Sequence, residues 1–454
     1  MVTPGEPGDP AAPIPDDQVR PVWASVGDTL RVAAEIAAPT VAIGVVKRRP
    51  AMMALAHRAH VDRPAIRLMR KLRHKYGAGP LRLRVPGRSL SLVLDPAQVG
   101  GLLADAPVPF SPDTTEKNAA LRHFQPHGVL ISEGGKREER RELNEAVLEP
   151  GLPLHHLAGP WAKIIHEEGA RIPEGMAELD ADRFTRHWWT IVRRITLGGD
   201  TAVDREITAL LDDLRLDANW AYARRQQEST RDRFLALVRH QVALDRPDSL
   251  AGELTKFAET SDTETDPAGQ LPHWMFAFDA AGIVTLRALA LLATHPAQRE
   301  RALGELEGLD LTEPHQLPYL RSCVLESVRL WPTTPALLRE SRSETAWGPD
   351  GTSFLVYTPF FHRDDETLPY ADDFAPDIWL DGRAQRNPAL VPFSGGPGIC
   401  PGRDVVLFTA STLLAVLLKE AEYTPEGTAA ALVPGRLPST LDHFGIRLGI
   451  GSRD

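Results

Sequence analysis

A glycine-rich loop with a single cysteine carries the clearest chemical signal in this sequence. The loop reads Phe393-Ser-Gly-Gly-Pro-Gly-Ile-Cys400-Pro-Gly402, and an apolar helical stretch at 405–418 follows it. A cysteine just before a helix faces unpaired backbone N–H groups and the positive end of the helix dipole, and both stabilise thiolate over thiol. Pro401 suits the first helical turn, and the glycines let backbone approach a flat ligand closely. The loop therefore predicts a site for an exposed, deprotonated sulfur.

Charged residues at helical spacing form a second group. Glu326 and Arg329 are three residues apart in the helical pattern 317–330, so they share one helix face and can pair. A basic cluster upstream places residues four apart on two different faces of one helix. Its two pairs are Lys136 with Arg140 and Arg137 with Arg141. For the first of these pairs, a solvated basic face is the plain alternative to a functional role.

A long apolar helix is predicted at 274–293. It is apolar on nearly every face, so it is either a membrane span or a helix buried in a large core. Asp279 and Arg287 lie well inside it, and Gly282 and Thr285 interrupt its apolar surface. These four residues favour a buried central helix in contact with a ligand or cofactor. A core helix with a tolerated glycine is the alternative.

The elements that must position these residues are mainly helical. Helical patterns dominate from 136 to 329, and alternation at 81–94 around Pro86-Gly87 predicts a β-hairpin. Strand patterns return at 354–357 and 444–450. We therefore expect a mainly α fold with small β-sheets built from segments that are distant in the sequence.

Composition limits the possible domain organisation and the classes of binding partner. The net charge of −10 over 454 residues argues against general affinity for nucleic acid or anionic membranes. Residues 1–18 are rich in Pro, Gly and Asp and predict a disordered tail. No clean linker divides 19–454, which we expect to form a single domain.

The two cysteines and the N-terminus point to the cytoplasm. Cys323 and Cys400 do not form the cysteine pattern of a secreted disulfide framework. Cys323 lies in a helical pattern and is expected to be a buried structural thiol. The N-terminus lacks the basic start and apolar run of a signal peptide, so we expect a cytoplasmic protein without a membrane anchor.

The cysteine loop resembles the metal-ligand loop of the cytochrome P-450 superfamily, Phe-x-x-Gly-x-x-x-Cys-x-Gly. Phe393, Gly396, Cys400 and Gly402 fill all four positions, and further motifs follow in family order from about 76 to 450. The resemblance implies haem b (iron protoporphyrin IX) between a long buried distal helix and the proximal helix after the loop. Cys400 would be the axial iron ligand, whose thiolate pushes electron density towards O–O cleavage.

The same resemblance implies a role for the apolar helix. Ala281, Gly282 and Thr285 match the family's distal segment, in which small residues accommodate dioxygen and the threonine hydroxyl relays protons. An ordinary Ala-Gly helix crossing is the alternative. The family's acid before the threonine is Val284 here, and Asp279, six residues upstream, cannot simply replace it because it lies well round the helix.

The resemblance also implies roles for the charged residues. Glu326 and Arg329 match the family's buried Glu-x-x-Arg pair, whose usual third partner, an arginine, is Ile378 here. The loop's usual His or Arg is Gly398, so one contact to a haem propionate is missing. The basic residues assigned to the propionates are Arg141, Arg137 as a second candidate, and Arg339.

The resemblance implies a soluble, actinobacterial-type haem-thiolate monooxygenase. It would hydroxylate or epoxidise a small apolar organic substrate, such as a secondary metabolite, with dioxygen and electrons from an external ferredoxin and ferredoxin reductase. The segments expected to line the pocket are 124–129, 278–285, 334–338 and 439–444.

Other functions stay open. Val284 suggests a peroxide-using haem-thiolate enzyme, although Thr285 weighs against it, and the altered motifs also allow a non-catalytic haem-binding protein. A dinucleotide site at 396–398 lacks the glycine register and the βαβ pattern, and His166-Glu-Glu lacks the second histidine of a zinc hydrolase. His155-His156 is interpreted as a polar turn.

Overall fold

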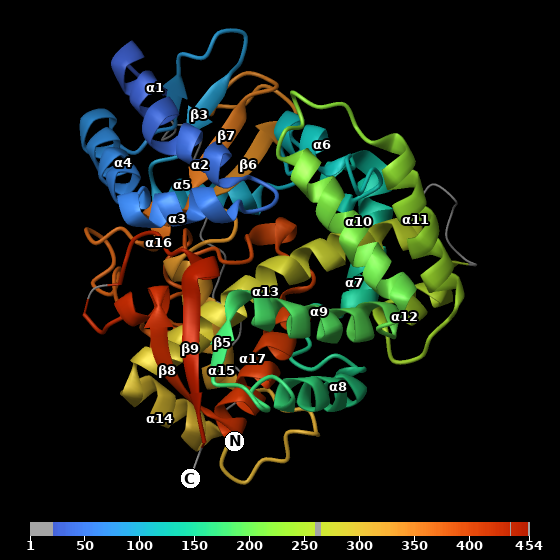
Figure 1. Cartoon of the computed structure of the whole chain (residues 1–454). Coiled ribbons are helices and arrows are strands. Elements are labelled where there is room, and N and C mark those ends of the chain that lie inside the picture. Colours follow the sequence, from blue (N-terminus) through green and yellow to red (C-terminus); the bar gives the residue numbers. More distant parts are fainter. Residues whose placement is uncertain (1–20, 259–264, 436, 453–454) are drawn as a thin grey trace.

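Helices form most of the protein, as the sequence predicts (Figure 1). The computed structural model describes residues 21–258, 265–435 and 437–452, so the predicted tail at 1–18 lies outside the described residues. The helices are α1 Val26–Val32, α2 Ala38–Ile43, α3 Pro50–Ala59, α4 Asp62–Tyr76, α5 Pro96–Ala104, α6 Thr115–Leu121, α7 Gly134–Leu148, α8 Ala158–Ala170, α9 Ala181–Leu197, α10 Ala202–Ala218, α11 Glu228–Ala243, α12 Leu250–Ala258, α13 Leu271–Thr294, α14 Pro296–Glu305, α15 Pro318–Leu330, α16 Thr358–His362 and α17 Arg403–Glu420.

Two small sheets join segments that are distant in the sequence. The first has the strand order β1-β2-β3-β7-β6-β4 and the second β5-β9-β8, and the predicted hairpin is the antiparallel β2–β3 pair. The strands are β1 Val22–Trp23, β2 Leu81–Leu83, β3 Leu90–Leu92, β4 Phe110–Ser111, β5 Glu178–Asp180, β6 Ala336–Ser341, β7 Ser353–Tyr357, β8 Glu422–Gly427 and β9 Ile446–Gly451. Figure 1 shows the first sheet among the N-terminal helices and the second at the other end of the molecule.

The central helix α13 crosses the middle of the molecule (Figure 1) and packs against α9, α15 and α17. By length and composition, this helical segment (267–294) is the one among the described residues that could cross a membrane, but 72% of its most apolar window is buried inside the protein. Burial in the core therefore explains its apolar surface, as predicted. The helix ends before Pro296, because a residue that precedes proline is disfavoured in the α conformation.

The proximal side of the molecule is built on α17, which begins directly after the cysteine loop. All of its residues from Asp404 to Leu418 are buried, because α8, α13 and α15 cover its faces. The approach of α8 is close at Gly169, where a Cβ atom would lie 3.0 Å from Leu413 and Val416 side chains. This packing holds the start of α17, and with it the cysteine loop, in a fixed place.

Candidate functional site: the cysteine loop and a buried cation cluster

The cysteine loop is fixed by its own backbone and by α5. The Cys400 N–H donates to the Phe393 carbonyl at 3.0 Å, and the Ile399 N–H donates to the Gly396 carbonyl at 3.0 Å. Gly396 has a φ of +58°, and a Cβ atom there would overlap the carbonyl oxygen of Leu103 at the end of α5. Only glycine fits this position, which explains one of the four motif residues by packing.

The electrostatics of Cys400 differ from the sequence-based expectation. Burial raises the pKa of the Cys400 thiol, and the Gly402 N–H, Arg141 and Arg403 only partly oppose this effect. The predicted stabilisation of the thiolate by backbone N–H is therefore present but is outweighed by desolvation. A coordinated metal ion deprotonates a thiol outright, so the position remains suited to metal binding.

Three cations converge beside this loop without a counterion. Arg339 on β6 is 3% exposed and Arg137 on α7 is 8% exposed, and the Nε atom of each lacks a hydrogen-bond partner. Lys117 on α6 donates from Nζ to the carbonyls of Pro112 at 2.7 Å and Leu338 at 3.0 Å. No described carboxylate lies within 4.0 Å of these three side chains as a salt-bridge partner.

The mutual repulsion of these cations shows in their pKa values. Burial, and then Arg137, lower the pKa of Arg339 to about 10. Burial, and then Arg339, lower the pKa of Lys117 well below its usual value. Buried charges normally occur with partners, so this cluster is suited to an anion such as the two propionates of a haem. The residues present therefore fit that cofactor.

The helix α7 distributes its basic residues differently from the sequence-based prediction. Arg137, the second candidate, lies near Arg339, whereas Arg141 donates to the Ile399 carbonyl at 2.8 Å and to Glu145 at 2.5 Å. Arg140 is buried and donates to Ser132 Oγ at 2.6 Å, so a solvated basic face is wrong for this residue. Lys117 was not among the residues predicted from the sequence, because a lone lysine in a short helix belongs to no recognisable motif or spacing.

The buried pair Glu326–Arg329 is complete without the arginine that the family places at 378. Arg329 Nε donates to Glu326 Oε2 at 2.6 Å, and Trp379 Nε1 donates to the same oxygen at 3.0 Å. The Ala375 N–H donates to Glu326 Oε1 at 2.8 Å. The expectation that the pair lacks a third partner is therefore wrong. Ile378 is fully buried in a small apolar cluster.

The distal segment of α13 is buried. Thr285 Oγ1 donates to the Ala281 carbonyl at 2.7 Å. A Cβ atom on Gly282 would lie 2.7 Å from the Trp188 ring of α9, so the Ala-Gly helix crossing that the sequence left as an alternative exists at Gly282. Val284 is 3% exposed, and Asp279 forms an ion pair with Arg215 of α10 at 2.5 Å. Val284 has no carboxylate and that of Asp279 is paired, so neither residue offers a free carboxylate to Thr285.

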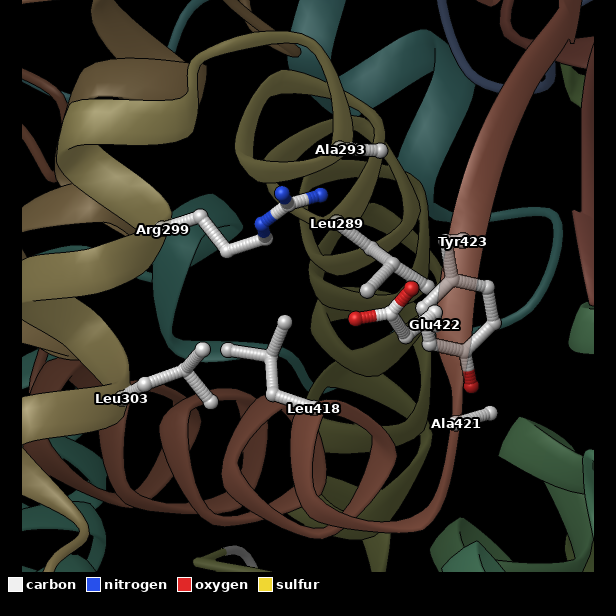
Figure 2. Close-up of a pocket in the computed structure, with 8 residues that line it drawn as sticks. All are labelled: Leu289, Ala293, Arg299, Leu303, Leu418, Ala421, Glu422 and Tyr423. Atoms are coloured by element: carbon white, nitrogen blue, oxygen red, sulfur yellow. The ribbon is translucent and has the colours of Figure 1, made fainter. Parts of the chain in front are cut away.

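Two other features do not belong to this site. Figure 2 shows a narrow pocket between the C-terminal parts of α13 and α17, the helix α14 and the start of β8, with Arg299 and Glu422 among leucine side chains. Its volume is only about 20 Å³, and no residue predicted for the site lines it. Cys323 is buried, as expected.

The two adjacent histidines are not a simple polar turn. His155 is 5% exposed and stacks on Trp161 with ring centroids 4.6 Å apart. Its Nε2 donates to the Val147 carbonyl at 2.8 Å, and its Nδ1 accepts the Leu157 N–H at 3.1 Å. With His156 and Glu149 it forms the one group of possible metal ligands among the described residues, but neither nitrogen of His155 is free.

Comparisons with known proteins agree with this geometry. The family model described as cytochrome P-450 matches residues 263–432. Relatives include the probable cytochrome P-450 4s3 of Drosophila melanogaster, 31% identical over 43% of this chain and 40% of that protein, and the human cytochrome P-450 4A22, 32% identical over 33% and 31%. These alignments span well under two thirds of the relatives' length.

Solved structures match over most of the chain. A zebra fish cytochrome P-450 with abiraterone has a TM-score of 0.65 at 16% identity and covers 86% of this chain and 99% of its own. The cyanobacterial CYP120A1 with bound retinoic acid has a TM-score of 0.67 at 16% identity over 85% and 94%. The fold is that of these structures, and the cation cluster beside the cysteine loop fits a haem with its two propionates. By this fold and by the family model over residues 263–432, the chain is similar to the cytochrome P-450 superfamily, whose members bind haem b.

Proposed function

We propose that this protein is a haem-thiolate monooxygenase with Cys400 as the axial iron ligand. The observation that carries the proposal is the cysteine loop, clamped against α5, beside three cations that have no carboxylate partner. Lys117, Arg137 and Arg339 would bind the propionates, and residues 19–454 would form one haem domain.

The bound haem would supply activation of dioxygen: one oxygen atom enters the substrate and the other leaves as water after uptake of two electrons and two protons. Cys400 Sγ would hold the iron and donate electron density to it. Thr285 Oγ1 holds a proton on the distal side, where it now donates to Ala281. Because Val284 is not an acid and Asp279 is paired with Arg215, protons would reach Thr285 through water, the substrate or another route. The buried α13 excludes bulk solvent from this side.

The proposed reaction is hydroxylation or epoxidation of a small apolar organic molecule, for instance a secondary metabolite. The apolar distal helix supports this substrate class. Among the relatives, one 28% identical over 36% of its length is named a taurochenodeoxycholic 6 alpha-hydroxylase. We further propose a cytoplasmic location and a ferredoxin-type donor with its reductase. The net charge of −10, which argues against attachment to anionic membranes, supports the first of these points.

The absorption spectrum of the purified protein, reduced and exposed to carbon monoxide, tests the proposal. We expect a strongly red-shifted Soret band that Cys400→Ala abolishes and Cys323→Ala keeps. Haem without this red shift would mean that the thiolate is not the ligand. Failure to bind haem would refute the proposal entirely.

A second candidate is a peroxide-using haem-thiolate enzyme. The absence of a free carboxylate beside Thr285 favours it, because a peroxide brings the oxygen at the reduction level that the dioxygen route must otherwise reach with protons and electrons. Turnover of one substrate with ferredoxin and dioxygen, compared with turnover with hydrogen peroxide alone, separates the two functions.

A further inference from the structure

An indole ring of α9 is packed into the distal segment of α13. Trp188 is 1% exposed, and α9 and α13 contact each other in the core (Figure 1). Its Nε1–H donates to the Phe278 carbonyl at 2.8 Å. In a regular α-helix this carbonyl accepts the Gly282 N–H, so the indole adds a second donor to an oxygen that has two lone pairs. The bond fixes α9 to the helical turn that begins at Phe278.

Trp188 and Gly282 also depend on each other sterically. A Cβ atom on Gly282 would lie 2.7 Å from both Cδ1 and Nε1 of the indole. The ring is held on other sides by Phe184, with ring centroids 6.3 Å apart, and by Phe278, also at 6.3 Å. Because the ring is enclosed, a larger residue at 282 would have to displace α13 or strain the core. The missing side chain at 282 is therefore explained by the indole of α9.

A second buried donor holds the same segment from another helix. Ser327 of α15 is fully buried, and its Oγ donates to the Val284 carbonyl at 2.9 Å. The anchored carbonyls of Phe278 and Val284 bracket Ala281, and Thr285 follows directly. The Thr285 hydroxyl donates to the Ala281 carbonyl at 2.7 Å, so its direction follows the position of this turn. Two neighbouring helices thus set the place of the distal hydroxyl.

We propose that Trp188 is a positioning residue for the distal site. Through its bond to Phe278 and its contact with Gly282, it sets the place of Thr285 relative to the cysteine loop. Small displacements of a positioned group are costly in catalysis even when the change lies far from the reacting atoms. This inference rests on the haem-thiolate function proposed above, because it needs a ligand that is bound between Thr285 and Cys400.

The infrared spectrum of the reduced holoprotein with carbon monoxide tests the proposal. The C–O stretching frequency reports the dipoles and contacts beside the bound gas, and it needs neither a substrate nor an electron-donor protein. Trp188→Phe keeps an aromatic ring and removes the donor, so we expect its C–O band to shift and broaden while the Soret band stays red-shifted. Gly282→Ala should also shift the C–O band, because its methyl group overlaps the indole.

Trp189→Phe is the matched control, because Trp189 is the next residue of α9 and is only half-buried. It should leave the C–O band unchanged. In a Trp188→Leu background, Gly282→Ala should shift the band much less than in the parent, since the overlap is gone. Gly282→Ala approaches the contact from α13, so it tests the proposal even if Trp188→Phe does not fold.

Amide hydrogen exchange of the holoprotein separates local positioning from general support of the fold. In Trp188→Phe we expect exchange over 278–286 to rise about two- to tenfold, the value of one neutral hydrogen bond, with α15 and α17 unchanged. A general structural role would raise exchange throughout the core and would overturn the proposal.

An unchanged C–O band in Trp188→Phe and Gly282→Ala, or equal shifts in Trp188→Phe and Trp189→Phe, would also overturn it. If the parent protein gave no red-shifted Soret band, the proposed haem-thiolate function would fail and this inference with it. A red-shifted Soret band in the parent, together with an unchanged C–O band in the variants, would overturn only the role of Trp188.

Discussion

Arg339 and Gly398 share one small volume: the Arg339 Nη2 atom lies 3.1 Å from the position that a Cβ atom on residue 398 would take. The same Nη2 donates to Ser394 Oγ at 3.0 Å, which holds the guanidinium group over the loop. The position at which the sequence lacks the expected basic side chain is therefore occupied by an arginine from β6. A basic residue at 398 would therefore require the Arg339 guanidinium group to shift.

We expect Gly398→His to release haem about tenfold faster than the parent protein, because the imidazole displaces the Arg339 guanidinium group from the loop. Transfer of haem to excess apomyoglobin measures this rate. Gly159→His is the control, since a Cβ atom at Gly159 meets nothing within 4 Å. Unchanged or slower release from Gly398→His would show that Arg339 does not hold the cofactor.

Lys117→Met and Arg137→Met should also release haem faster, by about tenfold to a hundredfold each, because each removes one charged donor from the propionates. The apoprotein should behave in the opposite way. Removal of one cation from an uncompensated cluster relieves repulsion, so the Tm of the apoprotein should stay the same or rise. The exposed Lys71→Met is the control for both measurements. A fall in the Tm of the apoprotein with normal haem retention would mean that the cations only support the fold.

Trp379→Phe should destabilise the protein by about 1.5–3 kcal/mol, because it removes the donor from a buried carboxylate oxygen of Glu326. Chemical unfolding of the parent and the variant measures the difference in the free energy of unfolding. Trp220→Phe, at an exposed position, should change little. Equal stability of Trp379→Phe and the parent would show that Trp379 does not replace the missing arginine as the third partner of the pair.

Stability should fall with acid below neutral pH because His362 and His273 stay neutral in the folded protein. Burial, and then Arg329, lower the pKa of His362 to about 3, and burial lowers that of His273 to about 4. Between about pH 6.5 and these values the unfolded chain binds protons that the folded protein does not, so the free energy of unfolding decreases as pH falls. Each group contributes up to about 1.4 kcal/mol per pH unit in that window.

Denaturant unfolding at pH 7, 6 and 5 measures this slope. His273→Gln should lower this slope by an amount that corresponds to about one bound proton, since glutamine does not titrate. The exposed His240→Gln should leave the slope unchanged. A slope that is the same in His273→Gln and the parent would contradict the neutral state of His273.

The sequence by itself determined the features that local spacing encodes. The cysteine loop, the Glu326–Arg329 pair, the buried α13 and the β2–β3 hairpin follow from glycine positions, helical spacing, all-round apolarity and strand alternation, and each is present in the structure. Each of these patterns lies within one short stretch of sequence, so it can be recognised without knowing which residues are neighbours in space.

Only the tertiary structure decided which distant residues meet. It brought Lys117 and Arg137 near Arg339, placed Trp379 on Glu326, and set Arg48 opposite Arg287. These relationships depend on how α6, α7, β6 and α13 pack, and on the desolvation that packing produces. A lone lysine, or an arginine inside an apolar helix, has no local pattern that specifies its partner, because the partner is set by the approach of a backbone hundreds of residues away.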